Sequence, residues 1–130
     1  MEPPIERIKI SQTAKEQLSR LKRITKIDQW NILCRWALCR SLAEPTLPSQ
    51  ITIKLDSNVE MTWRVFGGEM SDMLLMALKQ RCYNDALGTE KNVLAEQLIL
   101  HLHRGIAYLA GDVNIKKVED LMELATKNSK

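Results

Sequence analysis

The sequence is poor in aromatic residues and in cysteine. Its 130 residues include one Phe, two Tyr and three Cys. With so few aromatic rings, a platform that binds single-stranded nucleic acid by base stacking is a weak candidate. An odd number of cysteines without framework spacing indicates free thiols in a reducing compartment rather than a disulfide-stapled domain.

Long hydrophobic runs are also absent. No apolar stretch approaches the roughly 18 residues that a membrane-spanning helix needs. The first nine residues carry an early acid and lack the apolar core of a secretory signal. We therefore predict a cytoplasmic protein with no membrane contact. Because 45% of the residues are hydrophobic, the chain can bury a core, and its length suits a single domain, 1–130.

Positive charge is concentrated at one end of the chain. The net charge of the whole protein is +3, yet the segment 7–26 holds seven basic residues and one acid, Glu16. The rest of the chain is therefore acidic on balance. A localised basic surface is typical of proteins that bind a polyanion, most often nucleic acid, although a solvated helix face is the simpler alternative. The candidate DNA-binding residues are Arg7, Lys9, Lys15, Arg20, Lys22, Arg23 and Lys26.

The pattern of residues 5–44 predicts a strand followed by two helices. Apolar and polar residues alternate over 5–11, as in a short strand with one buried face. Ser11 can cap the next helix, in which apolar residues recur at i, i+4 and i+7. Asp28 is a plausible cap for a second helix that ends near Ala43. This second helix is apolar on most sides, so we expect it to be buried centrally or at a subunit contact.

The remaining sequence predicts a β-hairpin and more helices. Alternating residues on both sides of the turn-forming segment 56–58 indicate a hairpin over 50–66. The helical part extends over 70–127, with helices expected at 71–84, 90–109 and 115–126. The expected fold class is thus mainly α with small β elements (α+β).

The order of elements in 5–44 is that of ribbon-helix-helix DNA binders. In those proteins two chains pair their N-terminal strands, and the resulting ribbon enters the major groove. A strand this short needs a partner, and its polar face would present Arg7 and Lys9. That face lacks the mixture of Gln, Asn and Thr that reads bases. We therefore expect contacts with backbone phosphates rather than direct reading of base sequence.

No catalytic or metal-binding pattern emerges. His101 and His103 lie two apart, which on a helix separates them by about 200°, so they are not expected to share a metal ion. Cys34 and Cys39 lack Cys-x-x-Cys spacing and indicate buried structural thiols, while no orienting group is evident beside Cys82. We predict a protein with no metal, no cofactor and no enzymatic activity.

Four long segments carry a family resemblance. They are PIERIKISQTAKEQLSRLKR (4–23), NILCRWALCRSLAEP (31–45), WRVFGGE (63–69) and LHLHRGIAYLAG (100–111). Together they resemble the bacterial DNA sulfur modification protein family DndE, in the same order and nearly from end to end.

This resemblance implies an accessory subunit of DNA phosphorothioation, in which sulfur replaces a non-bridging phosphate oxygen. Its implied partners are a cysteine desulfurase, the iron–sulfur sulfurtransferase subunit DndC and the ATPase subunit DndD. It also implies a ribbon-helix-helix-like N-terminal part and a homotetramer that binds double-stranded DNA, preferably nicked, through surface lysines. The matching lysines are Lys9, Lys15, Lys22 and Lys26, and the arginines of the same segment are supporting candidates.

Two functional hypotheses remain open. The first is a non-catalytic DNA-binding subunit that acts by releasing counterions from phosphates. The second is a scaffold subunit that assembles the modification complex through protein–protein contacts. A third, an enzyme acting on a sulfur donor or a nucleotide, depends only on the free thiols.

Overall fold

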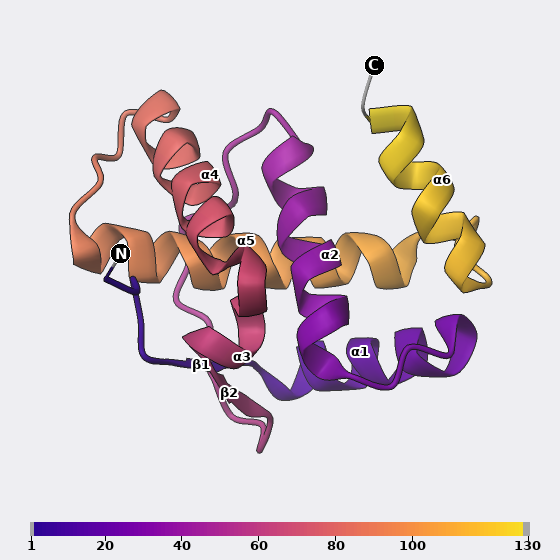
Figure 1. The fold of residues 1–130 in the computed structure, drawn as a ribbon. Coiled ribbons are helices and arrows are strands. Elements are labelled where there is room, and N and C mark those ends of the chain that lie inside the picture. Colours follow the sequence, from indigo (N-terminus) through magenta and orange to yellow (C-terminus); the bar gives the residue numbers. More distant parts are fainter. Residues whose placement is uncertain (1, 129–130) are drawn as a thin grey trace.

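A computed structural model, which describes residues 2–128, shows a mainly helical α+β chain (Figure 1). This confirms the expected fold class. The strands are β1 (Arg7–Lys9) and β2 (Glu60–Thr62). The helices are α1 (Gln12–Thr25), α2 (Trp30–Ala43), α3 (Trp63–Gly67), the 3₁₀ turn η1 (Gly68–Met70), α4 (Ser71–Asn84), α5 (Lys91–Gly111) and α6 (Val118–Asn128).

Helix α5 is the axis of the fold. Figure 1 shows it running across the molecule, with α2 and α4 crossing in front of it and α1 below. α2 packs against it more extensively than any other helix does. The buried residues of α2, among them Leu33, Ala37 and Leu38, belong to the hydrophobic core. The expectation of a centrally buried second helix is therefore confirmed.

The α2–α5 crossing depends on Gly105. A Cβ atom at this position would lie 1.7 Å from the carbonyl oxygen of Ala37. Because no side chain fits in that distance, the two backbones approach closely only where α5 carries a glycine. α5 continues through Gly105 to Gly111, slightly beyond the predicted end of this helix.

Strand β1 finds its partner within the same chain. It pairs antiparallel with β2, with Arg7 opposite Thr62, Ile8 opposite Met61 and Lys9 opposite Glu60. The need for strand pairing was thus correctly predicted, but the partner expected from a ribbon-helix-helix arrangement, the same strand of another chain, was not.

The prediction of a β-hairpin over 50–66 is wrong. Residues 51–55 have no regular secondary structure, and 63–67 are helical. The hydroxyl of Thr62 accepts a hydrogen bond from the backbone N–H of Val65 (3.1 Å) and so caps a helical turn. The side-chain period changes there from two to 3.6, which buries Trp63 and leaves Val65 exposed.

The helix starts show one success and one error. Ser11 caps α1, since its Oγ accepts a hydrogen bond from the Ala14 N–H at 3.0 Å. The predicted Asp28 cap is absent, because α2 begins after Gln29 and has no side-chain cap. Lys26 ends α1 in a left-handed conformation (φ 63°).

Two arginines hold the segment that follows α2. Arg81 donates hydrogen bonds to the carbonyls of Leu42, Glu44 and Thr46. Arg104 donates to the carbonyls of Ser41 and Thr46. These bonds satisfy acceptors that the end of a helix leaves free and fix the path of the chain toward residue 50.

Candidate nucleic-acid interface

The seven basic candidates project from β1 and α1, which the core holds in place. Ile8 and Ile10 bury the inner face of the strand segment, and Leu18 and Leu21 bury the inner face of α1. Because apolar residues recur at helical spacing on one side of α1, the basic residues are left on its remaining sides. The local fold therefore presents the charge outward.

The first group of basic residues lies near the small sheet. Arg7 forms an ion pair with Glu60 (3.1 Å), with its side chain 65% exposed. Lys15 donates a hydrogen bond from Nζ to Asn58 Oδ1 at 2.6 Å. Lys9 is exposed and makes no side-chain hydrogen bond or ion pair with any other described residue. Part of the charge at this end is thus neutralised by Glu60.

The second group surrounds a shallow hollow at the C-terminal end of α1. Three cations and one carboxylate line it, together with a serine and an indole: Ser19, Lys22, Arg23, Lys26, Asp28 and Trp30. Lys22 Nζ lies 4.1 Å from the centre of the Trp30 ring, a cation–π contact. Because cations outnumber the acid, this hollow is suited to an anionic group such as a phosphate.

Arg20 has a different role in the fold. Its Nη1 donates a 2.9 Å hydrogen bond to the carbonyl oxygen of Ala110, near the end of α5. The guanidinium thereby satisfies a carbonyl of the last helical turn and lies where the helix dipole favours a cation. It attaches α1 to α5, and its remaining N–H groups make no hydrogen bond to any other residue within 2–128.

The basic residues therefore do not form one compact cluster. Lys15 and Lys26 are eleven positions apart on or next to α1, so about 16 Å separates them along the helix. Arg7 and Lys9 lie beyond the N-terminal end. The structure instead produces an elongated basic surface with one group of residues near β1 and another at the hollow.

His103 fixes the start of α1. Its Nε2 accepts a hydrogen bond from the Ser11 N–H (3.1 Å), and its Nδ1 lies 2.7 Å from the Ile99 carbonyl oxygen. Both contacts are satisfied by a neutral ring with the proton on Nδ1. Burial lowers the pKa of His103, in agreement with that neutral form.

His101 is a buried structural residue. Its Nδ1 lies 2.8 Å from Ser41 Oγ, which also accepts a hydrogen bond from Arg104 Nε. Burial and the charges of Arg81 and Arg104 lower its pKa to about 4. Within residues 2–128, no three His, Cys, Asp or Glu side chains are placed to hold a metal ion.

The thiols are poorly suited to nucleophilic chemistry. Cys34 is buried as predicted, whereas the prediction of a buried Cys39 is wrong, because this residue lies on the outer side of α2 and is exposed. Burial raises the pKa of Cys34 to about 12 and also raises the pKa values of Cys39 and Cys82. Near neutral pH these groups are protonated thiols, whereas the thiolate is the reactive form.

Sequence reasoning missed the role of Trp30 at the hollow. Trp30 lies in an apolar sequence pattern that is typical of a packing residue, yet only part of its surface is buried. The turn after α1, with Lys26 in its left-handed conformation, brings the start of α2 back against Lys22. The left-handed Lys26 had no sequence signal, since this conformation favours glycine or asparagine.

The described elements define a mainly helical α+β chain with an elongated cationic surface on its first strand and helix. Among the described residues, no helix is long and apolar enough to cross a membrane. Residues 7–117 match the family model of DNA sulphur modification protein DndE. The chain belongs to this family.

Solved structures agree with the family assignment. DndE from Escherichia coli B7A, involved in DNA phosphorothioation modification, is 27% identical, with a TM-score of 0.67 over 81% of this chain and 96% of that one. A DndE mutant with two glycine-to-lysine substitutions, involved in DNA phosphorothioation, is 24% identical, with a TM-score of 0.61 over 81% and 98% of the two chains. No curated protein sequence matches the chain.

Proposed function

We propose that this chain is a non-catalytic subunit of the DNA phosphorothioation machinery that binds duplex DNA through its backbone phosphates. The observation that carries the proposal is the basic surface of β1 and α1, above all the hollow with Lys22, Arg23 and Lys26. The single domain 1–130 acts as one unit, with the helices behind α1 holding this surface in position.

The shape of the basic surface favours duplex DNA. The distance of about 16 Å along α1 exceeds the width of the major groove of B-DNA, about 12 Å. The groups at the two ends can therefore contact phosphates on opposite sides of a groove. Most of these side chains are lysines, which act as point charges without base selectivity. Family resemblance adds a preference for nicked duplex to the proposal.

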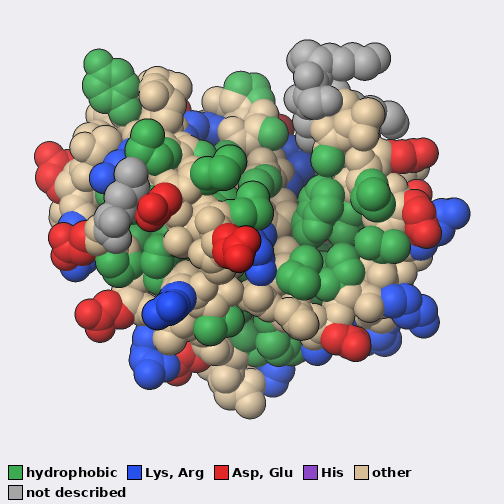
Figure 2. Space-filling view, viewed as in Figure 1, with side chains coloured by type: hydrophobic (Ala, Val, Ile, Leu, Met, Phe, Trp, Pro, Cys, Tyr) green, Lys and Arg blue, Asp and Glu red, His purple; other side chains and the backbone are tan. Residues whose placement is uncertain are grey.

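Self-association would multiply these phosphate contacts, and an exposed apolar surface supports it. Figure 2 shows hydrophobic side chains gathered over α2 and toward α6. A hollow there is lined by Ile32, Arg35, Trp36, Cys39, Met70 and Ala125, and the side chain of Met73 on α4 is 68% exposed. An apolar surface of this kind is typical of a protein contact. We propose a homo-oligomer, with four subunits as the family resemblance implies.

A scaffold function is the second candidate, and the same apolar surface favours it. In that case DndC or DndD covers the face of α2, and the basic surface docks an acidic protein. Strong binding to either subunit, with no binding to DNA at physiological salt, would replace the first proposal with this one.

A salt titration of duplex binding tests the DNA-binding proposal. If each of two chains neutralises about three phosphates, log K should fall with log[salt] with a slope of about −5. Changing Lys15, Lys22 and Lys26 together to Glu should abolish binding at physiological salt. The matched control changes Lys79, Lys116 and Lys117 to Glu, three lysines outside the segment 7–26, which alters net charge equally. Equal loss in both variants, or a slope near zero in the wild type, contradicts the proposal.

A further inference from the structure

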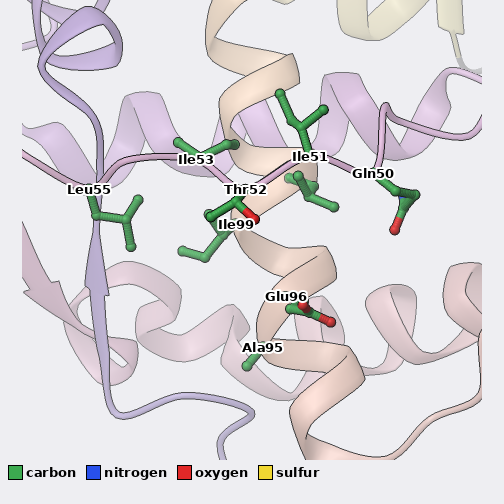
Figure 3. A pocket seen from close by; sticks show the side chains of 9 residues that line it. Gln50, Ile51, Thr52, Ile53, Leu55, Ala95, Glu96 and Ile99 are labelled. Atoms are coloured by element: carbon green, nitrogen blue, oxygen red, sulfur yellow. The ribbon is translucent and has the colours of Figure 1, made fainter.

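Residues 51–55 have the sequence of a strand but no strand partner. Figure 3 shows this segment running across α5. Among the described residues, no backbone N–H or carbonyl from Thr52 to Leu55 takes part in a hydrogen bond. The apolar–polar alternation that predicted a hairpin is therefore present, but its backbone groups have no hydrogen-bond partner among the described residues. An unpaired strand-like segment of this kind is a template for strand addition.

The side chains of the segment are exposed beside an empty groove. Ile51 is 64% exposed and Leu55 37% exposed. With Ile53 they border a groove of about 380 Å³ whose other wall is α5, including Ala95 and Ile99 (Figure 3). The described chain covers Ile53 only in part and leaves Ile51 and Leu55 exposed. A second strand laid along this segment would pair its backbone groups and bury its apolar side chains.

We propose that residues 51–55 pair antiparallel with the same residues of a second copy of this chain, about a two-fold axis at Ile53. The proposal deepens the self-association in the proposed function by naming one surface for it. Two-fold contacts are the commonest in homo-oligomers, and they require a self-complementary surface. The segment Ile-Thr-Ile-Lys-Leu meets this requirement, because its apolar positions are placed symmetrically about its centre.

The pairing in this register matches like with like. Ile53 lies on the axis, and Ile51 faces Leu55 of the partner subunit, so all apolar positions share one face of the pair. Lys54 faces Thr52 of the partner subunit on the other face. Shifting the axis to Lys54 would place two lysines opposite each other, which is unfavourable. Charge therefore favours the register centred on Ile53.

The charges at the groove are also self-complementary. Lys54 and Glu96 are both exposed, and neither forms an ion pair with another described residue. Glu96 lies on the α5 wall of the groove. A second copy brings one further lysine and one further glutamate to the same surface, so opposite charges are available across the contact. A heterologous peptide in the groove is an alternative occupant that the following experiment distinguishes.

Disulfide trapping tests the register. In a Cys39→Ser background, which removes the exposed native thiol, Ile53→Cys places two thiols at the two-fold axis. Oxidation should then give about ten-fold more cross-linked dimer than Val65→Cys, an exposed control site, because only facing residues bring their Cβ atoms within bridging distance. Ile51→Cys alone should not cross-link, but mixed with Leu55→Cys it should. Equal cross-linking at Ile51, Ile53 and Val65 would overturn the proposal.

The assembly mass gives an independent measurement. Ile53→Lys should reduce the mass of the assembly in sedimentation by half while leaving the melting temperature of the subunit unchanged. A wild type that is monomeric at all concentrations would overturn both this proposal and the self-association proposed above. An oligomer whose mass is unaffected by Ile53→Lys, with no trapping at Ile53, would overturn only this surface, as would a heterologous partner whose binding Ile53→Lys abolishes while self-association persists. DNA binding measured on the same samples reports separately on the basic surface.

Discussion

Helices α1 and α2 are adjacent, each 14 residues long, and differ in almost every other respect. α1 buries one narrow apolar face and carries basic residues on the others. α2 is apolar on most sides, buries its inner face on α5 and leaves Trp36 and Cys39 beside an apolar hollow. The difference assigns the two proposed contacts to different helices, the DNA contact to the basic sides of α1 and the subunit contact to the apolar outer side of α2.

The largest expected effect is a loss of folding stability where α2 packs against α5. Gly105→Ala places a methyl group against the Ala37 backbone and should destabilise the protein by about 3 kcal/mol, as overpacking at a backbone contact does. Urea unfolding measures the change. Gly111→Ala is the matched control, because a Cβ atom there meets nothing within 4 Å. If both variants unfold alike, the close crossing of α2 and α5 is not what the glycine provides.

Acid should loosen the end of α2 through His101. Its folded pKa of about 4 lies below the ordinary histidine value of 6.5, so the neutral ring stabilises the fold fully above pH 6.5. That contribution should be lost as the pH falls from 6.5 to 4, by about 3 kcal/mol in total. The free energy of unfolding, measured across this range for the wild type and for His101→Gln, isolates the effect. Parallel curves for the two proteins would contradict it.

A smaller effect is expected at the start of α1. Ser11→Ala removes the cap on Ala14 N–H and should cost about 1 kcal/mol. Thr13→Ala, at an exposed site two residues further on, is the control and should be nearly neutral. Thermal unfolding of the two variants measures the difference. A Ser11→Ala protein as stable as the control would show that the bonds of the Ser11 N–H to His103 and of the Gln12 N–H to Asp56 are sufficient to hold this end.

The smallest expected effect is on duplex affinity, through the contact of Trp30 on α2 with Lys22 on α1. Trp30→Leu keeps apolar bulk but removes the ring that positions Lys22. Duplex affinity should fall by about two-fold, in line with an exposed cation–π contact of about 0.5 kcal/mol. The slope of the salt titration should stay the same, because the number of charges is unchanged. A changed slope would mean that Trp30 decides which cations reach the DNA.

Local signals in the sequence predicted α1 and α4 well. The Ser11 cap and the helical spacing of Ala14 and Leu18 involve residues close together in the sequence, so they can be recognised without tertiary information. β1 pairs with β2, which lies more than 50 residues away in the sequence. The alternation at 51–55 and 61–65 instead indicated that these two neighbouring segments pair with each other. The Thr62 cap starts a helical turn at Trp63, and this turn buries Trp63 and Phe66. Because that burial depends on the tertiary structure, the alternation alone favoured the hairpin.

The candidate site was predicted in part. The charge run gave the basic residues, but which of them remain available depends on distant groups. Arg7 forms an ion pair with Glu60, and one N–H of Arg20 donates to the Ala110 carbonyl oxygen. The hollow exists because the turn after α1 brings Trp30 back to Lys22. Such long-range contacts leave no periodic trace in the sequence.

The bond from Arg20 to Ala110 has a mechanical consequence. Any pull on α1 is transmitted through this guanidinium to one end of α5, while His103 transmits it from the other end of α1 to the middle of α5. Two attachment points keep one rod from pivoting on another. α1 and α5 should therefore move together as a stiff lever, and a load applied at the basic surface should reach the whole length of the molecule.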